Sequence, residues 1–262
     1  MMSDRPANPT ILQIREISQP PSVTGRSNAE HWVADFYLRK ISPYLTRLLL
    51  KTPISANGVT YLMIATGLSI SAALLLPGYK GILLALFLSQ LQMLWDCCDG
   101  EIARWRSTQS PKGIFLDRVA HYLTESLIPI AFALRLAGWP ENEITDWRLP
   151  FLAALISIAI LLNKGFNDAV HVSRALSGVG KLSDSKEVGA PVKRWLRVLK
   201  APFKVIAVQR LFHSVEMSII IAIFGDNQAL IEIGIYVALF VTIGHLLSIL
   251  GSRKLDGNRA TK

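Results

Sequence analysis

The sequence contains very little cysteine and shows no leader of the kind that directs a protein for export. Cys97 and Cys98 are the two cysteines among the 262 residues, and they are adjacent. Because neighbouring cysteines rarely pair and no CxxC spacing is present for zinc, the pattern excludes a disulfide scaffold and predicts two reduced, packed thiols. Residues 1–27 lack the apolar core of a cleavable signal peptide, and their Pro and Ser content predicts a disordered N-terminal tail.

Charged side chains are scarce in six long apolar stretches. Hydrophobic residues make up 51% of the chain and gather in blocks of about 20 residues, the length that crosses a bilayer. Such blocks are too long and continuous for the strands of a soluble sheet. The pattern therefore predicts an all-α polytopic membrane protein with six transmembrane helices, placed near residues 57–76, 82–99, 114–136, 149–170, 204–224 and 228–250.

A mixed segment precedes the first span. Residues 28–52 combine apolar side chains such as Trp32 and Phe36 with the basic residues Arg39, Lys40, Arg47 and Lys51, which is typical of a helix lying in the headgroup layer. A soluble amphipathic helix is the alternative, and Pro43 is expected to break or kink the helix. The predicted organisation is thus a tail over 1–27, an interfacial helix over 28–52, a six-span domain over 53–251 and a basic cytoplasmic tail over 252–262.

The distribution of positive charge predicts orientation. The net charge of +9 fits nucleic acid or anionic lipid headgroups, but the basic residues flank apolar spans, so we expect contact with membrane lipids and no nucleic-acid partner. Every second loop is basic, and basic loops stay in the cytoplasm. Six spans then leave both termini, and the loop after the second span, on the cytoplasmic side of the cell's inner or plasma membrane.

An acidic motif lies where the second span meets the cytoplasm and continues into the third. Asp96 and Asp99 are three residues apart, and Asp117 and His121 are four apart, so each pair shares one helical face. Two antiparallel helices with a short loop can bring these faces together. Carboxylates so close repel one another, and the repulsion falls when they bind hard divalent cations. Arg104 adds a cation suited to phosphate, so the motif fits phosphoryl transfer.

This stretch resembles the CDP-alcohol phosphotransferase signature, D-x-x-D-G-x-x-A-R, about eight residues, then G-x-x-x-D-x-x-x-D. The matching positions, all in one register, are Asp96, Asp99, Gly100, Ala103, Arg104, Gly113 and Asp117. The family's architecture of six spans, a leading interfacial helix and a cytoplasmic site is also similar to the organisation predicted above. The likeness covers about residues 28–250.

The resemblance implies a function and a set of site residues. The activity would be transfer of a phosphoalcohol, here a phosphatidyl group, from a CDP-linked donor such as CDP-diacylglycerol to an alcohol acceptor, with release of CMP, in a homodimeric enzyme of phospholipid or related lipid biosynthesis. Asp96, Asp99 and Asp117 would hold two Mg²⁺ or Mn²⁺ ions. The nucleotide would lie against Asn57, Thr60, Gly100, Ala103, Arg104 and Ser110, although the Pro that precedes the family's Asn is missing before Asn57.

The chain departs from the family pattern at His121, where the signature has Asp as metal ligand and general base. Imidazole can do both jobs, because it ligates metals and its reference pKa of about 6.5 suits a base near neutral pH. It carries no negative charge, so one of the two metals should be held more weakly. Glu125, one turn further along, would orient His121 or replace the missing carboxylate; an ordinary polar role between helices is equally consistent.

The acceptor is not identified by the sequence. Arg174, Lys181 and Arg210 lie in basic cytoplasmic segments and could bind a phosphorylated acceptor, or could simply anchor the chain in the membrane. Two other classes of function remain open. A catalytically silent nucleotide-binding scaffold would explain the change at His121, and a divalent cation transporter would explain intramembrane carboxylates but not Gly100, Ala103 and Arg104 in register.

Overall fold

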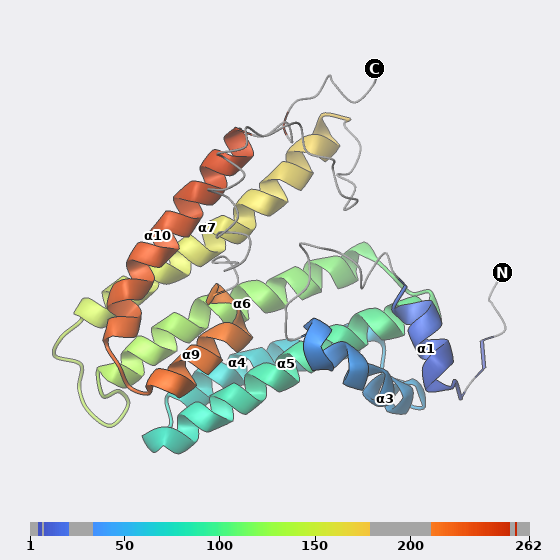
Figure 1. Ribbon diagram of the computed structural model, residues 1–262, viewed down its shortest axis with the longest axis horizontal. Coiled ribbons are helices and arrows are strands. Elements are labelled where there is room, and N and C mark those ends of the chain that lie inside the picture. Colours follow the sequence, from blue (N-terminus) through green and yellow to red (C-terminus); the bar gives the residue numbers. More distant parts are fainter. Residues whose placement is uncertain (1–4, 7, 21–33, 179–210, 252–254, 256–262) are drawn as a thin grey trace. The chain divides into compact units, whose positions relative to one another are not determined.

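The computed structural model describes residues 5–6, 8–20, 34–178, 211–251 and 255 (Figure 1). Among these residues all regular structure is helical. The helices are α1 (Ile11–Ser18), a π-helical turn η1 (Ala34–Leu38), α3 (Arg39–Leu50), α4 (Ala56–Leu74), α5 (Gly78–Arg106), α6 (Pro111–Leu136), α7 (Arg148–Leu176), α9 (Ser214–Phe224) and α10 (Ala229–Leu250). The all-α fold class is confirmed.

Four of the described helices, α4, α5, α7 and α10, are long and apolar enough to cross a membrane. α9 is apolar but shorter, and α6 is long but carries the charged residues of the acidic motif. A helix therefore overlaps each predicted span, and four are confirmed as candidates. The predicted fifth span is described only from residue 211 onward, so the count of six stays a prediction.

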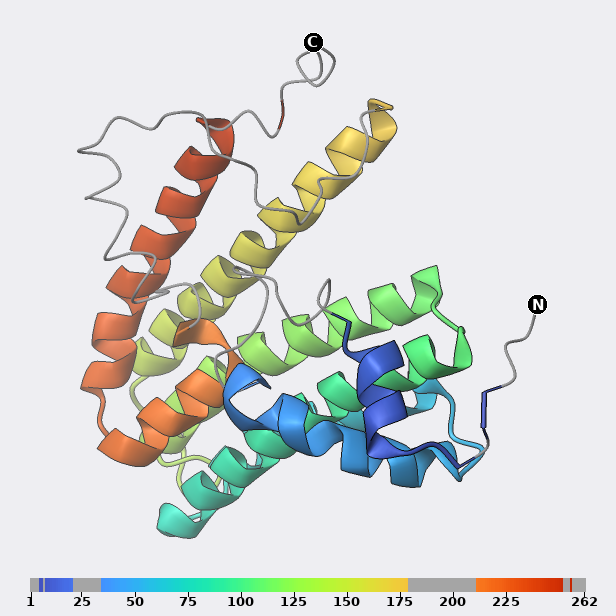
Figure 2. The same cartoon turned by 45° about the vertical axis from the view of Figure 1, so that its right-hand side comes forward.

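The chain divides into two compact units, the first made of Met1–Ala73 and Leu83–Thr124 and the second of Leu74–Ile82 and Glu125–Lys262. In the first unit α1 lies against α3 (Figure 2). Residues from α4 and α5 form an apolar core there, and side chains of α3 cover it; its buried members are Ala56, Val59, Cys98 and Ile102. Cys97 and Cys98 are free and buried, as predicted.

A close contact brings α4 against α6 within the first unit. A Cβ atom at Gly67 would lie 2.0 Å from Thr124 Oγ1, so only a residue without a side chain fits at this position. α5 is joined to α6 by a short turn. In this turn Ser110 caps α6 by accepting a hydrogen bond from the Gly113 N–H. Pro111 follows as the first helical residue, the place where proline is preferred. These signals begin α6 soon after α5 ends.

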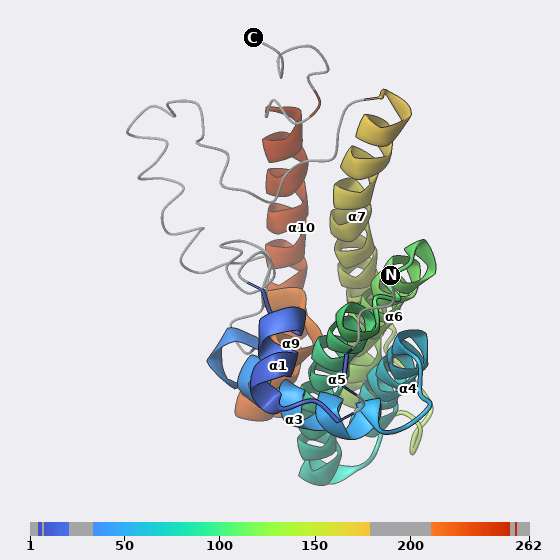
Figure 3. The ribbon, with the colours of Figure 1, turned by 90° about the vertical axis from the view of Figure 1, so that its right-hand side faces the viewer.

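In the second unit α7 and α10 lie side by side and run in the same direction (Figures 1 and 3). Residues near the start of α7 contact residues near the start of α10, and residues further along α7 contact residues further along α10. Arg148 pairs with Glu232 near the two N-terminal ends, and further along Thr242 donates to the carbonyl of Ala159. Parallel neighbours need an intervening crossing in the opposite direction, which agrees with the alternation of spans predicted from the charges.

The N-terminal segment differs from the expected disordered tail. Ile11–Ser18 forms α1, which begins with a complete capping box: Thr10 accepts from the Gln13 N–H, and the Gln13 side chain accepts from the Thr10 N–H. Ile14 and Ser18 are buried. A capping box satisfies two helix-end donors, and tertiary contacts of the buried residues supply the remaining stabilisation.

The predicted interfacial helix is helical over its described part, η1 and α3, while residues 28–33 lie outside the described residues. Pro43 is accommodated inside α3 rather than ending it. Whether this helix lies in a headgroup layer stays a prediction.

Candidate active site

The antiparallel pair α5 and α6 brings the predicted acidic residues together. His121 Nε2 lies 3.6 Å from Asp96 Oδ1 and 3.7 Å from Asp117 Oδ1. One ligand atom from each of these three residues lies within 4.8 Å of the other two. The side chains are partly exposed, at 26% for Asp96, 42% for Asp117 and 18% for His121, so an ion and a substrate could reach them.

These three residues fit a divalent cation. Two carboxylates and one imidazole are a common donor set for Mn²⁺ and related ions, and Mg²⁺ accepts the oxygens. Asp117 Oδ1 is buried and has no hydrogen-bond partner among the described residues. A buried carboxylate oxygen without a donor is costly, and a cation at this place would remove the cost.

Asp99, the remaining predicted metal ligand, makes a different kind of contact. Its Oδ2 atom accepts a hydrogen bond of 2.7 Å from Thr60 Oγ1, and the same hydroxyl lies 3.2 Å from the Ala56 carbonyl oxygen of α4. Thr60, which the sequence assigns to the nucleotide, therefore orients a carboxylate of the motif. The role of Asp99 as a metal ligand stays a prediction.

Two further predicted nucleotide-binding residues meet across Gly113. A Cβ atom there would lie 3.3 Å from Asn57 Oδ1 and 3.6 Å from Ser110 Oγ. The absence of a side chain thus lets the polar atoms of Asn57 and Ser110 lie close to the N-terminal end of α6. Backbone N–H groups at helix N-termini favour anions, which suits a phosphate at this place.

Arg104 and Gly100 form a second part of the motif. A Cβ atom at Gly100 would lie 3.0 Å from Arg104 Nη1 and 3.1 Å from Nη2, so the edge of the guanidinium that carries these two nitrogens faces the glycine. Any larger residue would displace the guanidinium. Ala103 packs at the edge of the apolar core instead, so its small size serves the contact between α4 and α5.

The sequence did not single out Glu101, which lies between these residues in α5. The side chain is fully buried, and its carboxylate accepts hydrogen bonds from Gln19, Ser42 and Thr46. The sequence offered one indication that Glu101 matters, because it is an acidic residue beside Gly100 at the polar end of a predicted span. Its partners could not be found, because they lie 55 to 82 residues away in the chain.

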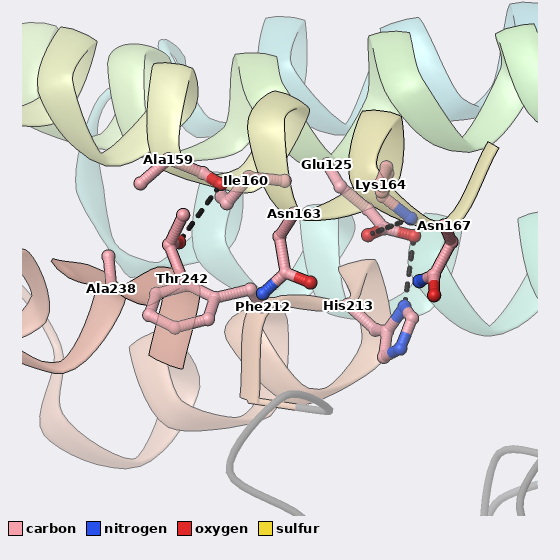
Figure 4. Close-up of a pocket in the computed structure, with 10 residues that line it drawn as sticks. All are labelled: Glu125, Ala159, Ile160, Asn163, Lys164, Asn167, Phe212, His213, Ala238 and Thr242. Carbon is pink, nitrogen blue, oxygen red and sulfur yellow. Dashed lines mark hydrogen bonds and ion pairs between the residues drawn. The ribbon is translucent and has the colours of Figure 1, made fainter. Parts of the chain in front are cut away.

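A second polar cluster lies in the second unit (Figure 4). Glu125 is 2% exposed, and its carboxylate lies 2.7 Å from Lys164 Nζ and 3.0 Å from His213 Nδ1. These side chains line a cavity of about 130 Å³, together with Asn163 and Asn167. Since a water needs about 10–15 Å³ of such volume, the cavity can take a small polar molecule. The proposed support of His121 by Glu125 stays untested.

The predicted acceptor-binding residues are only partly described. Arg174 lies near the C-terminal end of α7 and is half-buried. Lys181 and Arg210 lie outside the described residues.

One comparison with known proteins gives a match. The family model for CDP-alcohol phosphatidyltransferase matches residues 53–243, which include the whole acidic motif and begin after α3. No curated protein matches the chain.

Proposed function

Since the chain belongs to the CDP-alcohol phosphatidyltransferase family, we propose that it transfers a phosphatidyl group from a CDP-linked donor such as CDP-diacylglycerol to an alcohol, with release of CMP. The supporting observation is the meeting of Asp96, Asp117 and His121 across α5 and α6. Carboxylates that meet in space by chance would seldom also have the spacing of the signature. The family match covers the same residues.

Each site residue has a proposed task. Asp96, Asp99 and Asp117 would hold two Mg²⁺ or Mn²⁺ ions, and His121 would be a further ligand to the more weakly held one. When bound, such ions neutralise charge that develops on the breaking diphosphate. Arg104 donates to a phosphate oxygen, and Asn57, Thr60, Gly100, Ala103 and Ser110 form the nucleotide pocket.

The reaction is a single displacement at the donor's β-phosphorus. His121 accepts the proton of the acceptor hydroxyl, whose oxygen forms the new P–O bond. The bond between the β-phosphorus and the bridging oxygen breaks, and CMP leaves with that oxygen. Holding both reactants in this geometry supplies much of the rate enhancement in phosphoryl transfer.

The acceptor side of the proposal rests on basic residues. Arg174, Lys181 and Arg210 bind a phosphorylated acceptor, and Glu125 supports the site through His121. The protein is an integral membrane homodimer of the cell's inner or plasma membrane, with both termini and the active site in the cytoplasm.

CMP release tests this proposal. Purified protein in detergent or nanodiscs is incubated with CDP-diacylglycerol or other CDP-alcohols, a panel of acceptors, and Mg²⁺ or Mn²⁺. We expect CMP and a new lipid, identified by mass, that disappear with a chelator and in Asp96→Asn. Glu143→Gln, which neutralises an exposed carboxylate in another loop, is the matched control and should retain full activity.

The same experiment separates the rival functions. Binding of CDP without CMP release from any donor would favour a catalytically silent scaffold. Metal-dependent ion flux in proteoliposomes, without CMP release, would favour a divalent cation transporter. Either result would overturn the transferase assignment.

A further inference from the structure

The C-terminal end of α1 is bound directly to the arginine of the motif. The Ser18 carbonyl accepts a hydrogen bond of 2.5 Å from Arg104 Nε. The Ser18 hydroxyl donates to the Glu101 carbonyl at 3.0 Å, which fixes the position of Ser18 against α5. Two bonds from one residue therefore tie α1 to the polar end of α5 at Arg104.

Glu101 joins three helices at the same place. Its Oε1 atom accepts from Gln19 Nε2 at 2.8 Å and from Ser42 Oγ at 2.5 Å, and its Oε2 atom accepts from Thr46 Oγ1 at 2.6 Å. A buried carboxylate is tolerated when several donors bind it. Gln19 caps α1 while Ser42 and Thr46 belong to α3, so one side chain of α5 holds both preceding helices.

Arg5 adds another attachment from the N-terminal segment. Its Nη1 atom donates to the Arg104 carbonyl at 2.7 Å, and its guanidinium lies 5.8 Å from the centre of the Trp105 ring. Both the main chain and the side chain of Arg104 are thus held by residues before position 20.

The consequence concerns the orientation of Arg104. The hydrogen bond from Nε to the Ser18 carbonyl restrains the guanidinium, and its edge with Nη1 and Nη2 faces Gly100. A long arginine side chain loses much rotamer freedom when it binds an anion, and affinity rises when that freedom is removed beforehand. The family match begins at residue 53 and so does not account for these N-terminal contacts.

We propose that Ser18, Gln19 and Glu101 are positioning residues, which hold the Arg104 guanidinium in the orientation that binds the diphosphate of the CDP-linked donor. This inference rests on the proposed function for the identity of the donor. It makes α1 a part of the donor site, although α1 touches no reacting atom.

The test separates donor binding from the rest of catalysis. Ser18→Ala and Gln19→Ala are compared with wild type for kcat, for the KM of the donor and of the acceptor, and for the Kd of CDP by calorimetry. Ser18→Ala keeps the backbone carbonyl that accepts from Arg104 and removes the hydroxyl bond that fixes Ser18 against α5, whereas Gln19→Ala removes a donor to the Glu101 carboxylate. Loss of one such bond costs up to about tenfold in affinity. We expect roughly that rise in the donor KM and in the Kd of CDP, with the acceptor KM unchanged. Glu16→Ala, an exposed change in α1, should behave as wild type.

A second variant set shows that the effect passes through Arg104. In an Arg104→Ala background, Ser18→Ala and Gln19→Ala should cause no additional loss of CDP affinity, because coupled residues are not additive. Glu101→Gln should retain near wild-type affinity, since its amide oxygen can still accept from Gln19 and Ser42, whereas Glu101→Leu should not.

Three outcomes would overturn the inference: an unchanged Kd of CDP in Ser18→Ala and Gln19→Ala, an equal loss with and without Arg104, or a fall in melting temperature with no change in donor affinity. Calorimetry with CDP needs no turnover. If wild type binds CDP but no donor yields CMP, the transferase proposal fails while the positioning of Arg104 is still decided.

Discussion

His121 stands where the family signature has its last aspartate. The imidazole lies within 4 Å of both Asp96 and Asp117, at the place of the signature's last carboxylate. We expect His121→Ala to lower kcat by at least about 100-fold, since general-base catalysis contributes roughly that much. CDP affinity should change little, because the proposed nucleotide pocket is formed by other residues. Wild-type turnover in His121→Ala would refute the base assignment.

His121→Asp restores the carboxylate of the family pattern. Adding a negative charge beside Asp96 and Asp117 should tighten Mg²⁺ binding, which calorimetry or a Mg²⁺ titration of CMP release measures. We expect a lower half-saturating Mg²⁺ concentration with activity retained. An unchanged or higher Mg²⁺ requirement would show that position 121 does not bind the metal.

At the residue scale the sequence could predict those site members that local geometry brings together. Asp96, Asp117 and His121 follow helical spacing on two helices joined by a four-residue turn, so their meeting needed no long-range information. Glu101 and Ser18 could not be predicted, because their partners lie on helices distant in the chain.

The contact between α4 and α6 gives a prediction at the element scale. In Gly67→Ala the new methyl group would lie 2.0 Å from Thr124 Oγ1, and such overpacking costs about 1–3 kcal/mol. Gly244→Ala in α10 is the matched control, because among the described residues nothing outside the local helix backbone lies within 4 Å of its Cβ position. Thermal unfolding in detergent should show a lower midpoint for Gly67→Ala alone. Equal midpoints would mean that α4 and α6 are not in close contact.

The buried cluster of Glu125, Lys164 and His213 gives a second prediction at the element scale. Glu125→Leu leaves Lys164 buried without its carboxylate, which costs about 3–5 kcal/mol. Adding Lys164→Met removes the lone charge and should restore much of the lost stability. If the double variant is as unstable as the sum of the two single ones, Glu125 and Lys164 do not interact.

Element by element, the apolar helices were predictable and α1 was not. Long blocks of apolar residues can only be helices at this length, which is why α4, α5, α7 and α10 overlap the predicted spans. α1 is short and only half apolar, and its burial depends on partners in α3 and α5. The charged face of α6 makes its apolar content lower than that of the other spans.

At the scale of the whole molecule, the orientation of the protein in the membrane is a prediction that labelling can check. Cys97 is 2% exposed and Cys98 is fully buried, so neither should react with a membrane-impermeant maleimide. A cysteine introduced by Glu143→Cys should be labelled in intact cells, and one introduced by Thr261→Cys only after lysis. The reverse labelling would invert the topology and place the active site on the wrong side for a cytoplasmic donor.

The location of bound metal in the purified protein tests the central claim most directly. Anomalous scattering from crystals grown with Mn²⁺ and CDP should give a peak about 2.0–2.3 Å from oxygens of Asp96 and Asp117, with His121 beside it. A protein that binds CDP but shows Mn²⁺ only elsewhere, with Asp117 turned away from Asp96, would contradict the account.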